Sequence, residues 1–411
     1  MRILVLTSSN PGKDSTAEIH MKEVLRCLSE TDQVIAIAQP EHRLRGISGL
    51  TVKEVRSPRS FAKITAVGIF CKILLAGSSI IAATIELSRS QIDVIYARHG
   101  INSLGAVVLS KTFRKPLVLE VNALWSDDVR YYARHYALVK MAITETLARL
   151  LDVLSFRYSD MIVAVTEGIK KAIVEEFSMP PSRVQVIPNG ANTDLFKPTD
   201  QNAARLAVGL GKDDKIICFV GSIYYLTPWP GMSDLIAGAP RVLKKVSRAK
   251  FLIIGNGPLK NRWHLMVRGL NLQDAFIFAG RVPYDLVPTY INASDICVVP
   301  FRRMVNEQRG LSPLKLYEYL ACGKPVVGSD IRGVGDLLKS SDAGMAVPPE
   351  DPEALGEAIV LLLNDEKTRA RMANNARQIA VRNFSWRSTA RRISSVCAKA
   401  SRQTTQMTDD R

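Results

Sequence analysis

Cysteine is sparse and unpatterned in this sequence. Its six cysteines are scattered over 411 residues without a CxxC pair. This argues against a disulfide framework or a zinc site and predicts reduced thiols in a cytoplasmic compartment. A signal peptide is not expected either, because the apolar run in MRILVLTSSN is too short and is more typical of a first strand.

Acidic residues are too few to balance the basic ones. The 55 lysines and arginines exceed the 39 aspartates and glutamates, which gives a net charge of +16. Such an excess attracts nucleic acid, anionic lipid head groups or phosphorylated small molecules, although it can also serve solubility alone. Because the sequence lacks zinc-finger spacing, an RNA-binding signature and a long basic run, we expect no nucleic acid partner.

The apolar residues form short β-branched runs that alternate with longer helical stretches. Runs that are apolar on both faces and separated by helices are typical of parallel sheets covered on both sides. The series occurs twice, so we predict an α/β fold of two doubly wound, Rossmann-like domains with a ligand in a cleft at the carboxyl ends of the strands. The predicted strands are 2–7, 33–38, 92–97, 117–121, 161–165, 216–221, 251–255, 276–280, 295–300 and 325–328.

Composition also predicts where the domains end. We expect a first domain over 1–196, a linker over 197–214 and a second domain over 215–375. Residues 376–411 are expected to form helices that pack back on the first domain, with a frayed tail.

Residues 64–85, ITAVGIFCKILLAGSSIIAATI, carry a single charge, Lys72. The length fits a membrane span. The central lysine, two glycines and the strands predicted on both sides favour instead a buried or surface helix, with an interfacial membrane helix as the next alternative. The basic residues just upstream, which suit either anionic lipid or solvent, are Lys53, Arg56, Arg59 and Lys63.

The stretch GLSPLKLYEYLACGKPVV, residues 310–327, predicts a short and sharply terminated helix. Ser312 is suited to the N-cap, Pro313 to the first helical position and Gly323 to the position after the C-cap. Free amide groups at such a helix start, with Lys315 in the first turn, would suit a phosphate. Glu318 could accept hydrogen bonds from a ribose diol. The plain alternative is a Lys315–Glu318 pair on an ordinary helix.

Several stretches occur in an order and spacing that resemble a known family. Those of the second half are VIPNGANTDLFKP (186–198), CFVGSIYYLTPWPGMSDLIAGA (218–239), FLIIGNGPLK (251–260), FIFAGRVPYDLVPTYINASDICVVPF (276–301), residues 310–327 and NFSW (383–386). The first half matches less specifically and contributes DVIYARHG (93–100) and KPLVLEVNA (115–123). Together they resemble family 4 (group 1) of the glycosyltransferases, which have the GT-B fold, and in particular a subgroup with an SPxK sequence.

The resemblance implies a glycosyltransferase that moves a sugar from a nucleotide-sugar donor to an acceptor, with retention at the anomeric carbon. The positive charge and residues 64–85 suggest a glycan or lipid-linked acceptor in polysaccharide biosynthesis, and attachment to the inner face of a membrane. A sugar-nucleotide epimerase or phosphorylase of the same architecture and a non-catalytic partner subunit are the alternatives.

The resemblance also assigns donor contacts in the second half. Glu318 would bind the ribose, the amides of the loop from Gly310 to Leu314 would meet the diphosphate, and Gly221 and Ser222 would border it. The turn expected to border the base is Gly280, Arg281 and Val282.

The sequence departs from the family at two places. The family's first glutamate, which contacts the donor sugar, falls on Gly310, and Glu307 is nearby but out of register. The basic residues that follow the first strand of the second domain are replaced by Ser222 and Pro230. Lys315 would supply part of the missing charge, and the candidates for the rest are Arg302, Arg303 and Arg309.

In the first half, polar residues follow the predicted strands. By the same resemblance, the loop Asn10–Ser15 would approach the donor, and Gly12 and Asn122 would lie on the acceptor side. Arg98 or His99 would lie near the transferred sugar, unless His99 only caps a strand end. Glu120 could deprotonate the acceptor, or the leaving phosphate oxygen could act as the base.

Metal ligands with family spacing are absent from the sequence. No aspartate–x–aspartate motif occurs, and the adjacent Asp127 and Asp128 lack that spacing. Departure of a diphosphate needs charge stabilisation, which the helix start and Lys315 could provide. We therefore expect metal-independent transfer without a cofactor.

Overall fold

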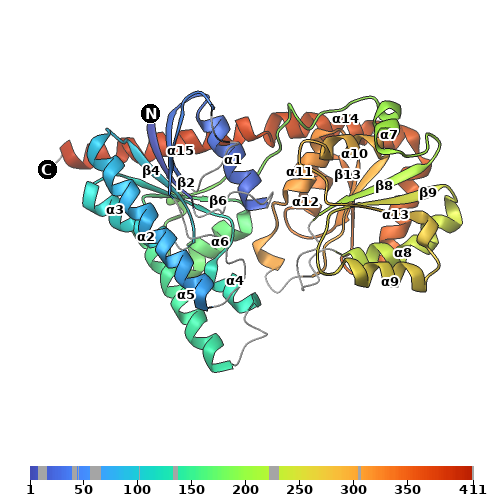
Figure 1. Cartoon of the computed structure of the whole chain (residues 1–411), viewed down its shortest axis with the longest axis horizontal. Helices are drawn as coiled ribbons and strands as arrows, with labels where there is room; N and C mark the ends of the chain where they lie inside the picture. Colours follow the sequence, from blue (N-terminus) through green and yellow to red (C-terminus); the bar gives the residue numbers. More distant parts are fainter. Residues whose placement is uncertain are drawn as a thin grey trace. The chain divides into compact units, whose positions relative to one another are not determined.

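The computed structural model describes residues 1–7, 16–38, 44, 46–55, 66–100, 102–132, 138–221, 231–303 and 307–409. For 66–76, 131–132, 138–143 and 404–409 it describes the backbone alone. The chain divides into two compact units (Figure 1). Unit 1 comprises Met1–Pro188 and Trp386–Arg411, and unit 2 comprises Asn189–Ser385.

Unit 1 is built on a seven-stranded sheet whose strand pairs are all parallel, in the order β3-β2-β1-β4-β5-β6-β7. The order reverses between β1 and β4. The strands are β1 (Arg2–Leu6), β2 (Gln33–Ala38), β3 (Leu50–Glu54), β4 (Val94–Arg98), β5 (Leu117–Val121), β6 (Met161–Ala164) and β7 (Val184–Val186).

Helices cover both faces of this sheet. One face carries α2, α3 and α5, with α3 lying between the other two, and the opposite face carries α1 and α15 (Figure 1). The apolar side chains between the sheet and the first set form one core cluster that includes Leu4, Ile95, Leu119 and Phe156. The helices are α1 (Thr16–Leu28), α2 (Ala66–Arg89), α3 (Ser103–Phe113), α4 (Trp125–Tyr132), α5 (Leu138–Tyr158), α6 (Glu167–Glu176) and α15 (Trp386–Asp409).

Unit 2 repeats the plan with six parallel strands, in the order β10-β9-β8-β11-β12-β13. The order reverses between β8 and β11, which makes the carboxyl ends of these two strands the switch point of the sheet. The strands are β8 (Lys215–Val220), β9 (Ala249–Ile254), β10 (Phe276–Gly280), β11 (Ile296–Val299), β12 (Val326–Ser329) and β13 (Gly344–Val347).

Two core clusters lie on the two faces of the second sheet. Phe219 and Phe251 belong to one of them, and Cys218 and Leu252 belong to the other, because successive side chains of a strand point to opposite faces. The helices are α7 (Gln201–Val208), α8 (Met232–Lys245), α9 (Lys260–Gly269), α10 (Val287–Ala293), α11 (Leu314–Ala321), α12 (Gly335–Ser341), α13 (Pro352–Asn364) and α14 (Glu366–Asn383). Single turns of 3-10 helix lie at 181–183, 273–275 and 307–309.

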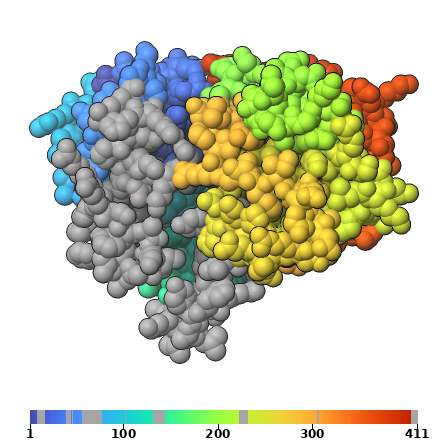
Figure 2. Space-filling model, turned by 45° about the vertical axis from the view of Figure 1, so that its right-hand side comes forward, coloured from blue at the N-terminus to red at the C-terminus, as the bar shows by residue number. Residues whose placement is uncertain are grey.

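The fold class predicted from the sequence is confirmed, since both units are doubly wound parallel α/β domains. The domain boundaries differ from the expected ones. Unit 2 begins at Asn189, and the span 197–214 is not a linker, because α7 packs against α10 within unit 2 and forms part of its surface (Figure 2). The helix α14 also belongs to unit 2, whereas α15 belongs to unit 1.

The apolar segment 64–85 lies, from residue 66 onward, in α2. Among its described side chains Ser79 and Ala83 are buried, while Ile81 and Ile85 are exposed. The described part of α2 thus has one buried face and one exposed face. Within the described ranges no helix is both long and apolar enough to cross a membrane. Arg56, Arg59 and Lys63 lie outside the described residues.

Arg377 of α14 holds three separate pieces of unit 2 together. Its guanidinium donates hydrogen bonds to the carbonyl oxygens of Phe196, Ala321 and Thr193, at 2.9, 2.7 and 3.2 Å. These carbonyls lie before α7 and at the end of α11, so the side chain replaces the hydrogen bonds that neither segment makes internally.

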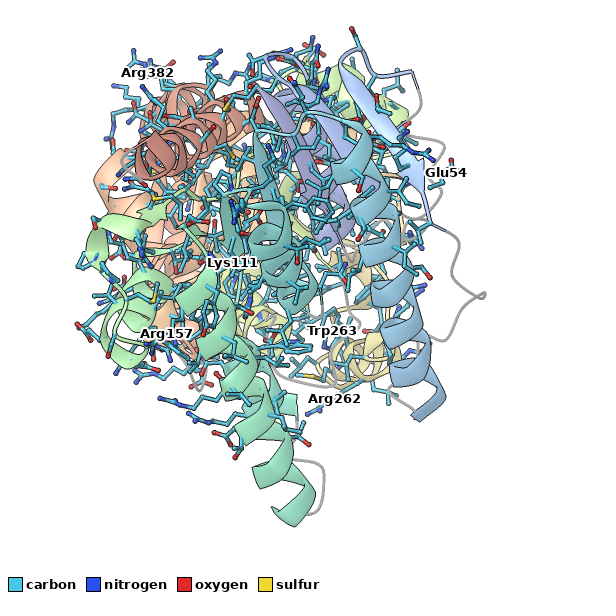
Figure 3. The ribbon with its side chains drawn as sticks, turned by 90° about the vertical axis from the view of Figure 1, so that its left-hand side faces the viewer. Glu54, Lys111, Arg157, Arg262, Trp263 and Arg382 are labelled. Atoms are coloured by element: carbon cyan, nitrogen blue, oxygen red, sulfur yellow. The ribbon has the colours of Figure 1, made fainter. Side chains whose placement is uncertain are left out.

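We expect Arg377→Met to lower the free energy of unfolding by about 2–3 kcal/mol, because part-buried carbonyls lose a charged donor. Arg382→Met is the matched control on the same helix, since Arg382 is exposed near its end (Figure 3). Urea unfolding followed by circular dichroism measures both. Equal losses for the two variants would contradict the assignment.

Candidate functional site

The helix that the sequence singled out is α11, and it begins one residue later than predicted. The N-cap is Pro313, which has no side chain able to cap, and the first helical residue is Leu314. Ser312 is not the N-cap because its hydroxyl lies 2.8 Å from that of Tyr317 and accepts a hydrogen bond from the amide of Asn189. No side chain therefore caps the amide groups at the start of α11.

The end of α11 follows the prediction. Gly323 has a φ of +64°, its amide donates to the carbonyl of Leu320, and the amide of Lys324 donates to the carbonyl of Tyr319. This is a Schellman pair of hydrogen bonds, which requires the left-handed conformation that glycine adopts readily. The helix is thereby held to eight residues.

The ammonium of Lys315 lies at the switch point of the second sheet. Its Nζ is 4.4 Å from the ring centre of Phe219, on β8, and 5.7 Å from that of Phe301, which follows β11. A Cβ placed on Gly221, directly after β8, would be only 2.6 Å from this Nζ. A glycine is therefore needed at 221 for the ammonium to occupy this position.

The charge of Lys315 is balanced only in part by the described residues of the protein. No carboxylate of the described residues forms an ion pair with it. Burial lowers the pKa of Lys315 to about 8, and the charge of Glu318 opposes that shift only in part. Aromatic faces stabilise an ammonium by about 0.5–2 kcal/mol, which is less than an ion pair in the same place would give. The site thus favours an incoming anion.

Glu318 lies one turn further along α11 and is buried, with 6% of its surface exposed. It interacts with other groups of the protein. The structure therefore places Lys315 and Glu318 on the same short helix, as predicted, but not as a simple surface pair.

The neighbouring strand ends are lined by glycines. The amide of Gly221 donates to the carbonyl of Ile254, and the amide of Gly255 donates to that of Gly280. A Cβ on Gly255 would lie 1.8 Å from the carbonyl oxygen of Gly221, whereas nothing lies within 4 Å of one on Gly280. At Gly221, Gly255 and Gly280, the edge of the sheet beside Lys315 (the rim) is thus formed by backbone atoms and not by side chains.

Gly310 has a structural reason to be glycine. Its φ is +70°, and a Cβ there would lie 3.1 Å from both the carbonyl oxygen and the Cγ of Arg332. The amide of Leu311 donates to the same carbonyl. A glutamate at this position would be strained, so the departure from the family sequence is built into the backbone.

The other predicted donor contacts are spread over unit 2. Arg302 forms an ion pair with Glu350 at 3.1 Å, so its charge is already neutralised. Arg303 is exposed, Glu307 is half-buried, and Arg309 and Arg281 interact with other protein groups. Val282 packs against the core cluster that contains α11. Gly12 and the rest of the Asn10–Ser15 loop, Ser222 and Pro230 lie outside the described residues.

In unit 1, His99 is buried and held at both nitrogens. Its Nε2 lies 2.7 Å from Asp152 Oδ1, and its Nδ1 lies 3.1 Å from the hydroxyl of Ser103. Asp152 also accepts hydrogen bonds from the amides of Trp125 and Ser126, at 3.1 and 3.0 Å. It caps the start of α4 from α5. Burial opposes ionisation of Asp152, but the hydrogen bond and charge of His99 and the hydrogen bonds from Ser126 together outweigh it and lower the pKa of Asp152.

Glu120 lies at the centre of a second buried cluster. It accepts hydrogen bonds from the hydroxyl of Tyr96 and the amide of Asn122, and His20 Nε2 lies 2.8 Å from its Oε1. Burial alone would raise its pKa, but His20 and these partners lower it to about 2. A carboxylate so stabilised is a poor proton acceptor, and its surroundings do not support the predicted role as a base.

Arg98 and Asp128 are the charged groups of this edge that keep contact with solvent. The guanidinium of Arg98 donates to the carbonyl of Ala17 at 3.2 Å. Asp128, at the start of α4, keeps an exposed surface. Partial desolvation of its carboxyl group, together with the negative charges of Asp127 and Asp152, raises its pKa to about 6. Asp152 and His20 were not predicted as members of these clusters. The one local signal for Asp152 is its place as the lone carboxylate in the apolar run LARLLDVL. Among described residues, no group of three acidic, cysteine or histidine side chains could hold a metal ion.

Comparisons with known proteins agree with this geometry. Residues 17–195 match the family described as Glycosyltransferase Family 4, and residues 200–379 match that described as Glycosyl transferases group 1. The chain is similar to the alpha-D-kanosaminyltransferase of Streptomyces kanamyceticus, with 25% identity over 68% of this chain and 69% of that protein. It is 28% identical to an uncharacterized glycosyltransferase of Methanocaldococcus jannaschii, over 57% of this chain and 59% of that protein.

Solved structures support the fold. A sucrose-phosphate synthase from Thermosynechococcus elongatus has a TM-score of 0.75 at 17% identity, covering 97% of this chain and 98% of that one. Anabaena HepE in complex with UDP and glucose has a TM-score of 0.72 at 18% identity, covering 97% and 100%. With both halves matched in order, the chain belongs to family 4 (group 1) of the glycosyltransferases and has the GT-B fold.

Proposed function

We propose that the protein transfers a sugar from a nucleotide-diphosphate donor to a glycan or lipid-linked acceptor, with retention at the anomeric carbon, as a hexosyltransferase. The observation that carries this proposal is the position of Lys315. Its ammonium lies at the switch point of the second sheet, beside an uncapped helix start and without a described anionic partner. The SPxK sequence of residues 312–315 supports assignment to that subgroup.

The donor would lie across the carboxyl ends of β8 to β11. Its diphosphate would take hydrogen bonds from the first amides of α11 and from Lys315. The base would pass over Gly280, where the rim is open, and Glu318 would accept hydrogen bonds from the ribose. The complexes of HepE with UDP and with UDP-glucose support a nucleotide of this kind.

In the reaction the bond between the anomeric carbon and the diphosphate oxygen breaks, and the acceptor oxygen bonds to the same face of that carbon. Lys315 and the helix start stabilise the charge that develops on the leaving diphosphate, so we propose that no metal is required. The acceptor proton passes to the leaving phosphate oxygen, because Glu120 is engaged and its pKa is low. Arg98 remains the candidate contact to the transferred sugar.

The acceptor and the site of action are inferred from charge. We propose an acceptor that is a glycan or is linked to lipid, met at the cytoplasmic face of a membrane.

The missing first glutamate favours one rival, a partner subunit that keeps the fold without donor chemistry. The backbone at Gly310 has a φ of +70°, which favours glycine, so this position provides no carboxylate to contact the donor sugar. Thermal-shift measurements with UDP-, GDP- and ADP-linked sugars separate the two, since a bound ligand raises the apparent stability. A shift with one donor, followed by product formation with an added acceptor, supports transfer. Epimerised donor without acceptor would indicate an epimerase.

We expect Lys315→Met to weaken binding of UDP, GDP or ADP, whichever binds best, by about 10–100-fold, because a charge-assisted hydrogen bond to phosphate is lost. Glu318→Gln should weaken it about tenfold through the ribose. Isothermal titration calorimetry measures both. Lys245→Met, at the exposed end of α8, is the control and should leave affinity unchanged.

Nucleotide binding should also depend on pH through Lys315. Since its pKa is about 8, the ammonium is charged below pH 8 and loses its proton above it. Affinity for the nucleotide diphosphate should therefore fall about tenfold between roughly pH 7 and pH 9. Lys315→Arg, which stays charged, should remove this dependence. An unchanged slope in that variant would show that another group titrates.

Glu120→Gln tests the assignment of the base. It should lower the melting temperature, because the buried cluster around His20 loses its anion, yet the dependence of the transfer rate on pH should keep its shape. Loss of the acidic limb of that profile in a folded variant would restore Glu120 as the base.

A further inference from the structure

Exposed apolar side chains are gathered on one face of unit 1. Six large aliphatic side chains in the described part of this unit are exposed, and all lie on α2, α3 and α5. The three helices are neighbours on the same side of the sheet, the side toward the viewer in Figure 3. They are Ile81, Ile85, Val108, Leu147, Leu150 and Val153, with exposures from 36% to 64%.

The described part of unit 2 shows no such grouping. Its exposed leucines, such as Leu206, Leu265 and Leu361, lie on α7, α9 and α13, three separate helices. Single exposed leucines are normal on a protein surface, whereas a row shared by neighbouring helices marks an interaction surface. On α2 the two isoleucines are four residues apart, and on α5 the leucines are three apart, so each helix presents one apolar stripe.

The charge of the same face is positive. Arg89, Lys111 and Arg157 are exposed on the three helices, and Figure 3 labels the last two. The carboxylates on their described parts are neutralised: Glu86 pairs with Lys53 at 3.3 Å and Glu145 with Arg130 at 2.5 Å, while Asp152 is buried in the His99 cluster. The exposed basic side chains therefore give this face a positive charge that attracts anionic groups.

We propose that this face of unit 1 binds the surface of an anionic lipid bilayer, with the aliphatic side chains entering the head-group region and the basic ones contacting lipid phosphates. A row of aliphatic residues framed by lysine and arginine is the pattern of surface-bound amphipathic helices. A complementary protein would need carboxylates and apolar pockets in register, whereas a bilayer can meet the stripes of α2 and α5 and the single Val108 of α3 without any such match. The inference deepens the proposed function, on which it rests for a lipid-linked acceptor.

Sedimentation with vesicles tests the proposal on the full chain. We expect binding to phosphatidylcholine vesicles that contain about one third phosphatidylglycerol and little binding to phosphatidylcholine alone. Lys111→Ala with Arg157→Ala should weaken binding about 25-fold, or about fivefold for each charge. The triple variant Ile81→Gln, Leu147→Gln, Leu150→Gln should weaken it at least about tenfold.

The matched control is Leu206→Gln, Leu265→Gln, Leu361→Gln in unit 2, which should bind vesicles as the unchanged protein does. Equal losses in both triple variants, or no sedimentation of the unchanged protein at low salt, would overturn the proposal. So would a dimer by light scattering that the unit 1 variant alone dissociates, since the face would then join two copies.

Nucleotide binding separates this outcome from that of the proposed function. The unit 1 triple variant should bind UDP, GDP or ADP as before, which also shows that it is folded. Lys315→Met should lose nucleotide affinity and still sediment with vesicles. Failure of one measurement with success of the other therefore identifies which of the two proposals is wrong.

Discussion

The proposed donor site depends on the position of a single lysine ammonium, which is held at the switch point of the second sheet. Lys315 reaches that point because Gly221 carries no side chain. Within the described part of the chain, its charge is balanced in part by two aromatic rings and by the carboxylate of Glu318 on its own helix. The eight-residue length of α11 keeps the helix start and this ammonium together. Phosphate is the ligand class that both features favour.

Positive charge is a weaker guide to partners than the total of +16 suggests. Several cations are engaged inside the fold: Lys324 donates to the carbonyls of Asn292 and Ser294, and Arg205 pairs with Asp295 at 2.8 Å while donating to the carbonyl of Ala293. Arg377 does the same for three carbonyls. Among the described residues, the cations left to attract anions therefore include Lys315 of α11 and those on exposed helix faces.

The sequence predicted the central strands because their β-branched runs are buried on both sides, as in β1 and β11. It missed β3 and β13, which are edge strands with partly exposed side chains, LTVKE and GMAV, and so lack that pattern. The residues of α7 were also predicted to belong to a linker, because their polar composition gives no sign of the contact with α10. That contact buries Ala204 and Arg205.

A position at the end of a strand was not enough to identify the functional residues of unit 1. Arg98, His99 and Glu120 all end parallel strands and were equally good candidates, yet their roles depend on distant residues. His99 is held by Asp152, 53 positions away, and Glu120 by Tyr96, 24 positions away. Such pairing holds these side chains in place at the edge of the sheet. The strand-end position alone therefore did not distinguish these three residues, because the role of each depends on which side chain of another element engages it, as Asp152 of α5 engages His99.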